Sequence, residues 1–309
     1  MPERSVAALR PIVTRVYQNH SIDSTRWGQF DVREGDVVVA SGYKAGTTWV
    51  QLIVLQLLLP AEPLPPIDQR SPWLDSPLLP LDDVLAMLAA HPGRRVIKTH
   101  LPLDGLPYDA DARYVVVCRD ARDVAMSLWN HYQKLVRYPF LRDPQHAGRV
   151  GGPLPRCPSD LREFWRSWIT RGWFRWEREG YPFWANLRHT QTWWAWKHLP
   201  NLLFVHYGDL LADLPGQVRR IASHIGVRVT PPDIARVAGA AAFDRMRANA
   251  DVLVPMARTA FRGGGGSFIH AGTNGRWRGA LTDEDLALYD AAAGRELSID
   301  CRHWLEGGR

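Results

Sequence analysis

The segment from residue 37 to residue 59 constrains the fold of this chain more than any other part of the sequence. Residues 37–40 form an apolar, mostly β-branched run, which predicts a buried strand. A turn bounded by Gly42 and Gly46 follows, and residues 47–59 are apolar on nearly every side until Pro60 ends the pattern. A strand, a glycine-bounded loop and a helix in this order present free backbone N–H groups at the helix N-terminus. The sequence therefore predicts an anion site there.

A short strand that runs into a loop is expected at residues 95–100, and apolar segments at residues 114–118 and 202–206 predict two further strands. These strands alternate with helical patterns such as residues 81–90 and 121–132. Strands that are apolar on both faces and alternate with helices indicate an α/β fold, with a central parallel sheet flanked by helices. Ligands of such folds bind beyond the carboxyl ends of the strands. We therefore expect the side chains that follow four different strands to meet there: Lys44, His100, Arg119 and Tyr207.

The remaining segments are less regular. Residues 161–197 have helical spacing and contain eight tryptophans, most of which we expect to pack helices on the sheet. An alternative is that a few of them, with Trp73, line an apolar substrate pocket. The chain is loop-like from residue 249, with a tetraglycine at 263–266 that is flexible by composition and could act as a lid. A last helix is expected at residues 283–293.

Composition narrows the class of protein. A formal charge of +6 and a pI near 9.4 fit an anionic ligand, but no run of five or more Lys or Arg residues occurs, so a nucleic-acid partner is not expected. Three cysteines without paired spacing argue against a disulfide framework and against a zinc site. The first ten residues lack the apolar core of a signal peptide, and the apolar run at 50–59 is too short to span a bilayer. We therefore expect a cytoplasmic protein without a membrane span or a metal.

Lysine is scarce, because only four of the 38 basic residues are lysines. Two of the four, Lys44 and Lys98, follow predicted strands. Lysine is a compact point charge that can also donate a proton, which arginine does not readily do. Their placement favours catalytic roles for both.

The glycine-bounded loop differs from that of magnesium-dependent nucleoside triphosphatases. Their pattern is G-x-x-x-x-G-K-[ST], whereas here Gly46 is followed by Thr47 and the lysine comes earlier, at Lys44. An ATP-dependent small-molecule kinase is thus disfavoured. It stays open as an alternative, as does a non-catalytic nucleotide-binding protein.

Four motifs resemble those of the cytosolic-type sulfotransferases. Residues 41–49, S-G-Y-K-A-G-T-T-W, resemble that family's 5′-phosphosulfate loop (T-Y-P-K-S-G-T-T-W), and residues 98–102 read K-T-H-L-P as in the family. Residues 119–127 are similar to its 3′-phosphate segment (R-N-x-K-D-V-x-x-S), and residues 272–278 resemble its late glycine-rich motif. The matches run in order from residue 41 to about residue 282. The resemblance implies one sulfotransferase domain over residues 1–309, with the P-loop-like sulfotransferase fold.

The resemblance also implies a reaction. A sulfuryl group would move from 3′-phosphoadenosine 5′-phosphosulfate (PAPS) to a hydroxyl or amine of a small, apolar or aromatic acceptor, leaving adenosine 3′,5′-bisphosphate (PAP). In the family's pattern, Lys44 stabilises the leaving oxygen, Lys98 neutralises the transferring group and His100 is the general base. The residues that the resemblance assigns to the donor are Lys44, Ala45, Gly46, Thr47, Thr48, Trp49, Arg119, Ser127, Tyr207, Phe243, His270 and Gly272.

The departures from the family pattern concentrate near the 3′-phosphate. His270 and Ala271 stand where the family has an arginine–lysine pair, so two phosphate ligands are absent. The arginines that could compensate are Arg262, Arg276 and Arg278. We interpret Arg122 and Asp123 as an exposed or ion-paired face. Of the family's dimer motif only Thr282 is kept, which leaves the oligomeric state open.

Overall fold

The computed structural model describes residues 10–60, 65–91, 93–136 and 152–308. The expectation that the N-terminus carries no signal peptide falls on residues 1–9 and lies outside these ranges. Within them, no helix combines the length and the apolar character that crossing a bilayer requires.

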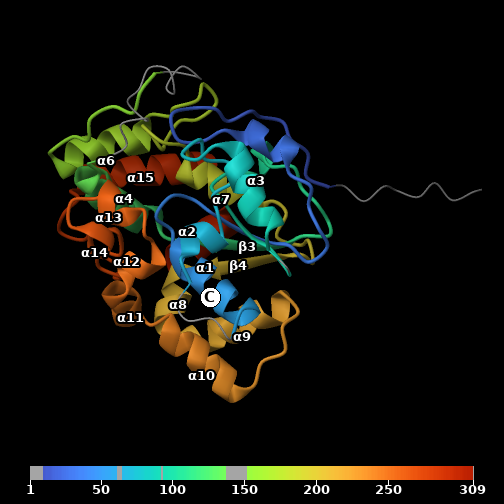
Figure 1. Ribbon diagram of the computed structural model, residues 1–309. Helices are drawn as coiled ribbons and strands as arrows, with labels where there is room; N and C mark the ends of the chain where they lie inside the picture. The colour runs from blue at the N-terminus through green and yellow to red at the C-terminus, as the bar shows by residue number, and fades with distance from the viewer. Residues whose placement is uncertain (1–9, 61–64, 92, 137–151, 309) are drawn as a thin grey trace, which may run out of the picture.

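Four parallel strands form the central sheet, in the order β2–β1–β3–β4. Figure 1 shows the helices around the sheet and labels β3 and β4. The strands are β1 (Val37–Ser41), β2 (Val96–Thr99), β3 (Arg113–Cys118) and β4 (Leu202–His206). In register, Val39 lies opposite Lys98 of β2 and Val115 of β3. The predicted strands and the parallel sheet are confirmed. Since all four strands are parallel, the loops after them open at one edge of the sheet.

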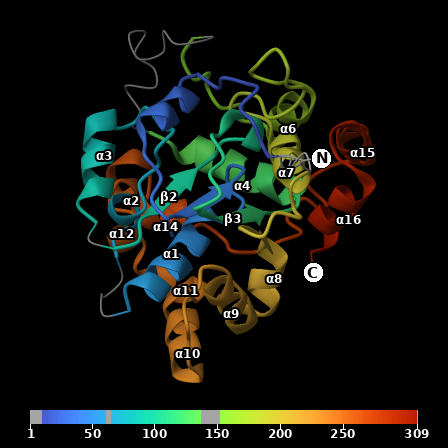
Figure 2. The same cartoon turned by 90° about the vertical axis from the view of Figure 1, so that its right-hand side faces the viewer.

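Alternate strand residues face opposite sides and form two cores. Val37 and Val39 pack with α1 (Thr47–Leu58), α9 (Leu214–His224) and α10 (Pro231–Ala240). Val38 and Ala40 belong to the other core. The helices of that second side are α4 (Ala121–Lys134), α6 (Leu161–Thr170), α7 (Asn186–Trp194), α15 (Asp283–Glu296) and α16 (Ile299–Gly307). Figure 2 shows α1, α9 and α10 on one side of the strands and α4, α6 and α7 on the other. The prediction that helices flank the sheet is confirmed.

The remaining elements are short and lie in the connections. They are η1 (Ser24–Gln29), α2 (Ile67–Arg70), α3 (Leu81–Ala89), η2 (Leu103–Gly105), α8 (Tyr207–Ala212), α11 (Phe243–Ala248), α12 (Ala250–Leu253), α13 (Ala257–Ala260) and α14 (Gly264–Phe268).

Residues 171–185 are a loop, so the prediction of a continuous helical region from 161 to 197 is wrong. Two buried acidic side chains order this loop, because they accept backbone N–H groups at the start of α7 that have no partner within that helix. Glu177 accepts from Ala185 at 3.0 Å, and Glu179 accepts from Asn186 and Leu187 at 2.9 Å each. Tertiary hydrogen bonds of this kind leave no trace in hydrophobic periodicity.

The tetraglycine is also not the flexible loop that its composition predicts. Residues 264–266 belong to the short helix α14. The Gly265 N–H donates to Asp251 Oδ1 at 2.8 Å, and a Cβ at Gly265 would lie 2.6 Å from the Ala250 carbonyl carbon. Glycine is needed here because α14 approaches the backbone of α12 closely.

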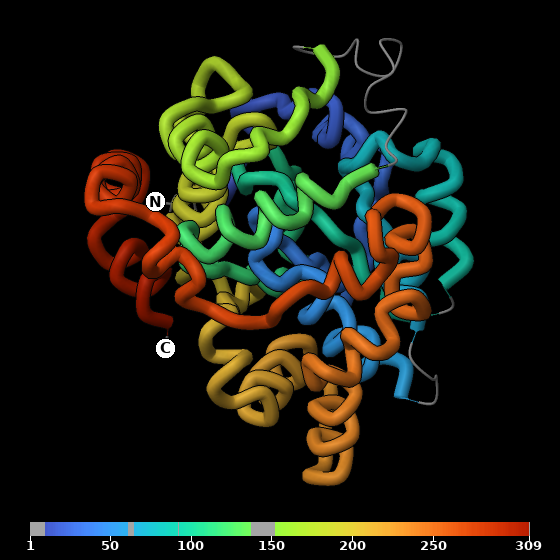
Figure 3. The backbone as a smooth tube through the Cα atoms, turned by 90° about the vertical axis from the view of Figure 1, so that its left-hand side faces the viewer, coloured from blue at the N-terminus to red at the C-terminus, as the bar shows by residue number. Residues whose placement is uncertain are grey.

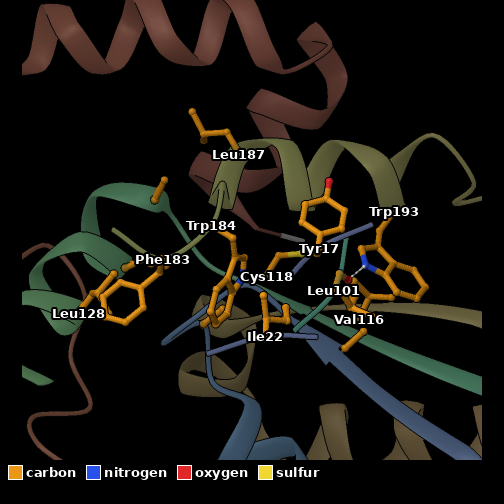
Figure 4. Packing of buried hydrophobic residues seen from close by; sticks show 14 of the residues in the cluster. Tyr17, Ile22, Leu101, Val116, Cys118, Leu128, Phe183, Trp184, Leu187 and Trp193 are labelled. Carbon is orange, nitrogen blue, oxygen red and sulfur yellow. Dashed lines mark hydrogen bonds between the residues drawn. The ribbon is translucent and has the colours of Figure 1, made fainter. Parts of the chain in front are cut away.

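Most of the tryptophan-rich segment packs in the core, as expected. Trp165, Trp168 and Trp193 are fully buried. Figure 4 shows Trp184 and Trp193 among apolar side chains, with the Trp193 indole N–H donating to the Leu101 carbonyl at 3.1 Å.

Candidate functional site

The backbone conformation of the loop after β1 favours glycine at position 46. Gly46, at φ +113°, lies immediately before α1, and Lys44 also has a positive φ of 61°. A Cβ at Gly46 would lie 2.8 Å from the Tyr207 ring, so a larger residue would displace that ring. The loop therefore turns into α1 with its free N–H groups at the carboxyl edge of the sheet.

A cavity at this edge, the first cavity, brings together nearly all the residues expected from the sequence. The expected residues that line it are Lys44, Gly46, Thr47, Thr48, Trp49, Lys98, His100, Arg119, Ser127, Tyr207, Phe243, His270 and Gly272. Ala45 is buried and does not line it. The side chains that follow β1, β2, β3 and β4 thus meet as their strand ends predict. Lys98 lies within β2, so the expectation that it follows the strand is wrong.

Within the described part of the chain, three cations in the first cavity form no direct ion pair, although carboxylates act on two of them from a distance, Asp75 and Asp68 on Lys98 and Asp123 on Arg119. Among the described residues, no salt bridge involves Lys44, Lys98 or Arg119. Burial, reinforced by Lys98 and Arg119, lowers the pKa of Lys44 to about 7. Burial also lowers the pKa of Lys98 to about 8. Removing several like charges from water without directly paired counter-ions is unfavourable, so the first cavity suits a ligand with several negative charges.

His100 is held as a proton acceptor. Its Nδ1 lies 2.8 Å from the Ser41 backbone carbonyl, which can only accept, so Nδ1 carries the proton and Nε2 is left as the basic nitrogen. Burial, with a further contribution from Lys98, lowers the pKa of His100 well below its usual value. The ring is therefore neutral at neutral pH, as a general base requires.

Asp75 positions His100, and the sequence analysis missed it. This fully buried carboxylate accepts the His100 backbone N–H at 3.1 Å and the indole N–H groups of Trp73 (2.7 Å) and Trp27 (3.2 Å). The Trp73 ring in turn contacts the His100 ring edge-on, with 4.8 Å between centroids. An isolated aspartate outside any motif gives no sequence signal for this role.

His131 is a second histidine at the site that sequence reasoning missed. Its Nδ1 lies 3.2 Å from Lys44 Nζ, and it lines the first cavity from α4, one helical turn after Ser127. Burial and the neighbouring Lys44 lower its pKa well below the usual value. The helical spacing from Ser127 was the available signal, because residues four apart share a helix face.

The turn at residues 272–276 is fixed by residues that follow β3. The Arg119 guanidinium donates to the Thr273 carbonyl at 2.8 Å and to Asn274 Oδ1 at 2.9 Å. Asp123 Oδ1 accepts the N–H of Gly275 at 2.8 Å. Asp123 is thus buried and hydrogen-bonded to backbone, and its interpretation as an exposed or ion-paired face is wrong.

The arginines near this turn differ in placement. Arg276 lines the first cavity, whereas Arg262 and Arg278 are exposed and do not line it. Arg122 is ion-paired with Asp120 at 2.6 Å, as expected.

Three aromatic rings, those of Trp49, Tyr207 and Phe243, also line the first cavity. Trp49 packs edge-on against Tyr207 at 5.4 Å, and Gly272, at φ +66°, lies against the Phe243 ring. Among the described residues, no hydrogen-bond partner reaches the buried Trp49 Nε1 or the buried Nδ1 of His270. Unpaired polar atoms beside flat rings suit a heteroaromatic base with phosphates.

A second cavity of about 390 Å³ adjoins the first. Five residues line both cavities: Tyr43, Thr48, Lys98, His131 and Phe268. The other walls of the second cavity are mainly apolar and come mostly from α2, the connection between α2 and α3, and the segment around α12–α14. Figures 2 and 3 show these parts of the chain side by side. Trp73 lines it, whereas none of the eight tryptophans between residues 161 and 197 lines either cavity. Lys98 thus stands where an anionic ligand and an apolar ligand would meet.

Among the described residues, no three His, Cys, Asp or Glu side chains lie close enough together to hold a metal ion.

Comparisons with known proteins agree with this geometry. The family model described as "Sulfotransferase domain" matches residues 34–299. A glycolipid sulfotransferase of Mycobacterium bovis (strain BCG / Pasteur 1173P2) is 32% identical and covers 97% of this chain and 96% of its own length. Sulfotransferase 2B1 of Mus musculus is 27% identical over 84% of this chain and 71% of its own length. A crystal structure of retinol dehydratase in complex with androsterone and inactive cofactor PAP superposes with a TM-score of 0.70, at 25% identity, over 92% of this chain and 87% of that one.

Proposed function

This chain belongs to the sulfotransferase family and is a PAPS-dependent sulfotransferase, and from that premise we propose how its residues divide the reaction. PAPS occupies the first cavity. The acceptor is a small molecule with an apolar or aromatic body that lies in the second cavity and offers a hydroxyl or an amine at Lys98. The observation that carries this proposal is the shared wall of the two cavities at Lys98.

The residues of the first cavity fit the donor. The N–H groups at the start of α1, with Thr47 and Thr48, bind the 5′-phosphosulfate. Arg119, Ser127 and His270 bind the 3′-phosphate, and Arg276 takes over from the missing arginine–lysine pair, because it alone of the three candidate arginines lines the cavity. Trp49, Tyr207, Phe243 and Gly272 surround the adenine. Ala45 contributes through the backbone of the loop.

The chemistry follows from the placement of three side chains. PAPS supplies an activated sulfuryl group, whose in-line transfer places negative charge on the sulfuryl oxygens and on the leaving phosphate. Lys98 neutralises the sulfuryl oxygens, and Lys44 stabilises or protonates the leaving oxygen, for which a pKa of about 7 is well matched. His100 Nε2 accepts the acceptor's proton.

The two rival functions fit the site less well. A magnesium-dependent kinase of this loop type requires a lysine after the second glycine, and this chain has Thr47 there instead. A non-catalytic nucleotide-binding protein would not need a neutral histidine with a fixed tautomer beside two lysines.

The substitution His100→Ala tests the assignment of the base. We expect transfer from PAPS to fall by about 10²- to 10⁴-fold, the usual contribution of a general base. The Kd for PAP, measured by calorimetry, should change little, because the ring does not hold a phosphate. A variant that transfers at the wild-type rate would contradict the assignment.

We further propose that residues 1–309 form one domain, that the protein acts in the cytoplasm, and that it has no nucleic-acid partner. The basic charge without Lys/Arg runs supports the last point.

A further inference from the structure

Two residues that line the second cavity each carry a buried polar atom without a hydrogen-bond partner among the described residues, namely His131 Nε2 and Asp68 Oδ1. Asp68, in α2, lines this cavity, and its buried Oδ1 accepts no hydrogen bond from any described residue. The other carboxylate oxygen lies 3.4 Å from the Met256 backbone nitrogen, and the backbone N–H groups of Asp68 and Gln69 also act on the carboxylate. A buried acceptor oxygen without a donor is costly, so its presence calls for a donor from outside the chain.

Among the described residues, no side chain that lines the second cavity donates to Asp68 Oδ1, although the Lys98 charge acts on this carboxylate from a distance. Its neighbours along the cavity wall are mostly apolar, and they include Ile67, Leu78, Leu79, Met87 and Val254. The Gln51 amide is already committed, since its Nε2 donates to the Ser71 carbonyl at 2.9 Å and to Ser71 Oγ at 2.8 Å. Lys98 lies over the Trp73 ring at 4.6 Å and forms no salt bridge with Asp68 among the described residues.

Asp68 also joins the two walls of the second cavity. It is carried by α2, while Met256 precedes α13 on the segment opposite. Figures 2 and 3 show these two parts of the chain next to one another. A ligand in the second cavity with one end at Lys98 therefore passes a carboxylate that is fixed between two walls.

We propose that the Asp68 carboxylate binds a second donor group of the acceptor, a hydroxyl or an amine apart from the group that is sulfated. The enzyme then selects apolar acceptors that carry two polar groups and rejects those that carry one. This inference rests on the proposed placement of the acceptor in the second cavity.

The test compares small alcohols whose length is varied, because the span between the two polar groups is to be found. The probes are 1-alkanols, the α,ω-diols, the ω-amino alcohols and the ω-methoxy alcohols of the same chain lengths. Calorimetry on the PAP complex gives the Kd of each, independently of turnover. Transfer from PAPS gives kcat/KM for the same probes.

In the wild type, at the best length, we expect the diol or the amino alcohol to bind at least about tenfold more tightly than the alkanol and the methoxy alcohol. Asp68→Leu should abolish this preference. Asp68→Asn keeps an acceptor oxygen but no charge, so it should lose the preference for the amine and retain part of that for the diol. Asp82→Asn, at an exposed first-turn aspartate of α3, is the matched control and should leave all preferences unchanged.

Three results would overturn the inference. One is a wild type that shows no preference at any length. Another is an Asp68→Leu variant that keeps the preference, and the third is a set of variants that weaken all probes alike, as expected if Asp68 merely balanced Lys98. Failure of transfer for every probe, with the binding preference intact, would instead contradict the proposed function.

Discussion

Sequence motifs identify three of the cations that line the first cavity, whereas only the structure identifies the fourth. Lys44, Lys98 and Arg119 occupy motif positions, whereas Arg276 is one of three arginines between which spacing does not decide. Its place in the cavity wall assigns it to the 3′-phosphate in our proposal.

Replacing Arg276 by alanine should therefore weaken PAP binding by about ten- to a hundredfold, the usual loss for a charge-assisted hydrogen bond. Arg278→Ala is the control, since that exposed side chain lies over Trp277 and outside the cavity. Calorimetric titration with PAP measures both. Equal losses in the two variants would point to a general effect of charge and against a direct contact.

The lowered pKa of Lys44, about 7, makes donor binding depend on pH. The lysine loses its charge as pH rises through that value, so above it an anionic ligand must draw a proton onto Nζ when it binds. PAP affinity should then fall with rising pH, by up to about tenfold per unit for each lysine that takes up a proton. Lys44→Arg should flatten the profile, because arginine stays charged. Affinity that is constant from mildly acidic to mildly alkaline pH would contradict the role of Lys44.

The strands could be predicted from the sequence, whereas several short helices could not. The four strands were predictable because buried parallel strands are continuous apolar runs. Helices α12, α13 and α14 were not, since contacts such as Gly265 N–H to Asp251 fix them, and such contacts have no periodicity. Asp75 and Asp68 were missed for the same reason, because their roles depend on which segments pack together. His131 differs, since its helical spacing from Ser127 was a signal in the sequence.

The close contact between Gly272 and the Phe243 ring gives a prediction about the turn at residues 272–276. A Cβ at Gly272 would lie 2.4 Å from the Phe243 ring, so Gly272→Ala should displace this ring and weaken PAP binding by at least about tenfold through lost stacking. Gly279→Ala is a close control, because Gly279 also has a positive φ, of 76°, but nothing lies within 4 Å of its Cβ position. That variant should lose about 1 kcal/mol of stability and keep its affinity. Thermal unfolding and PAP titration together separate strain from loss of the binding surface.

The location of the site follows from the parallel arrangement of the central sheet. A parallel sheet opens all its loops at one edge, and this chain places a cation or a base after each of β1, β2 and β3. The sequence was sufficient to predict that arrangement and the donor. The sequence did not predict that two cavities lie at this edge and share Lys98, because the second cavity depends on how α2, α3 and α12–α14 pack together.

The measurement that tests this account most directly is transfer of radiolabelled sulfate from PAPS, with magnesium chelated, to a panel of apolar and aromatic alcohols and amines. We expect label to appear on an organic acceptor, with one PAP formed for each sulfate ester or sulfamate and no requirement for ATP. Label that stays on PAPS, or leaves only as inorganic sulfate, while PAP still binds tightly would contradict the claim that the two cavities form one transfer site.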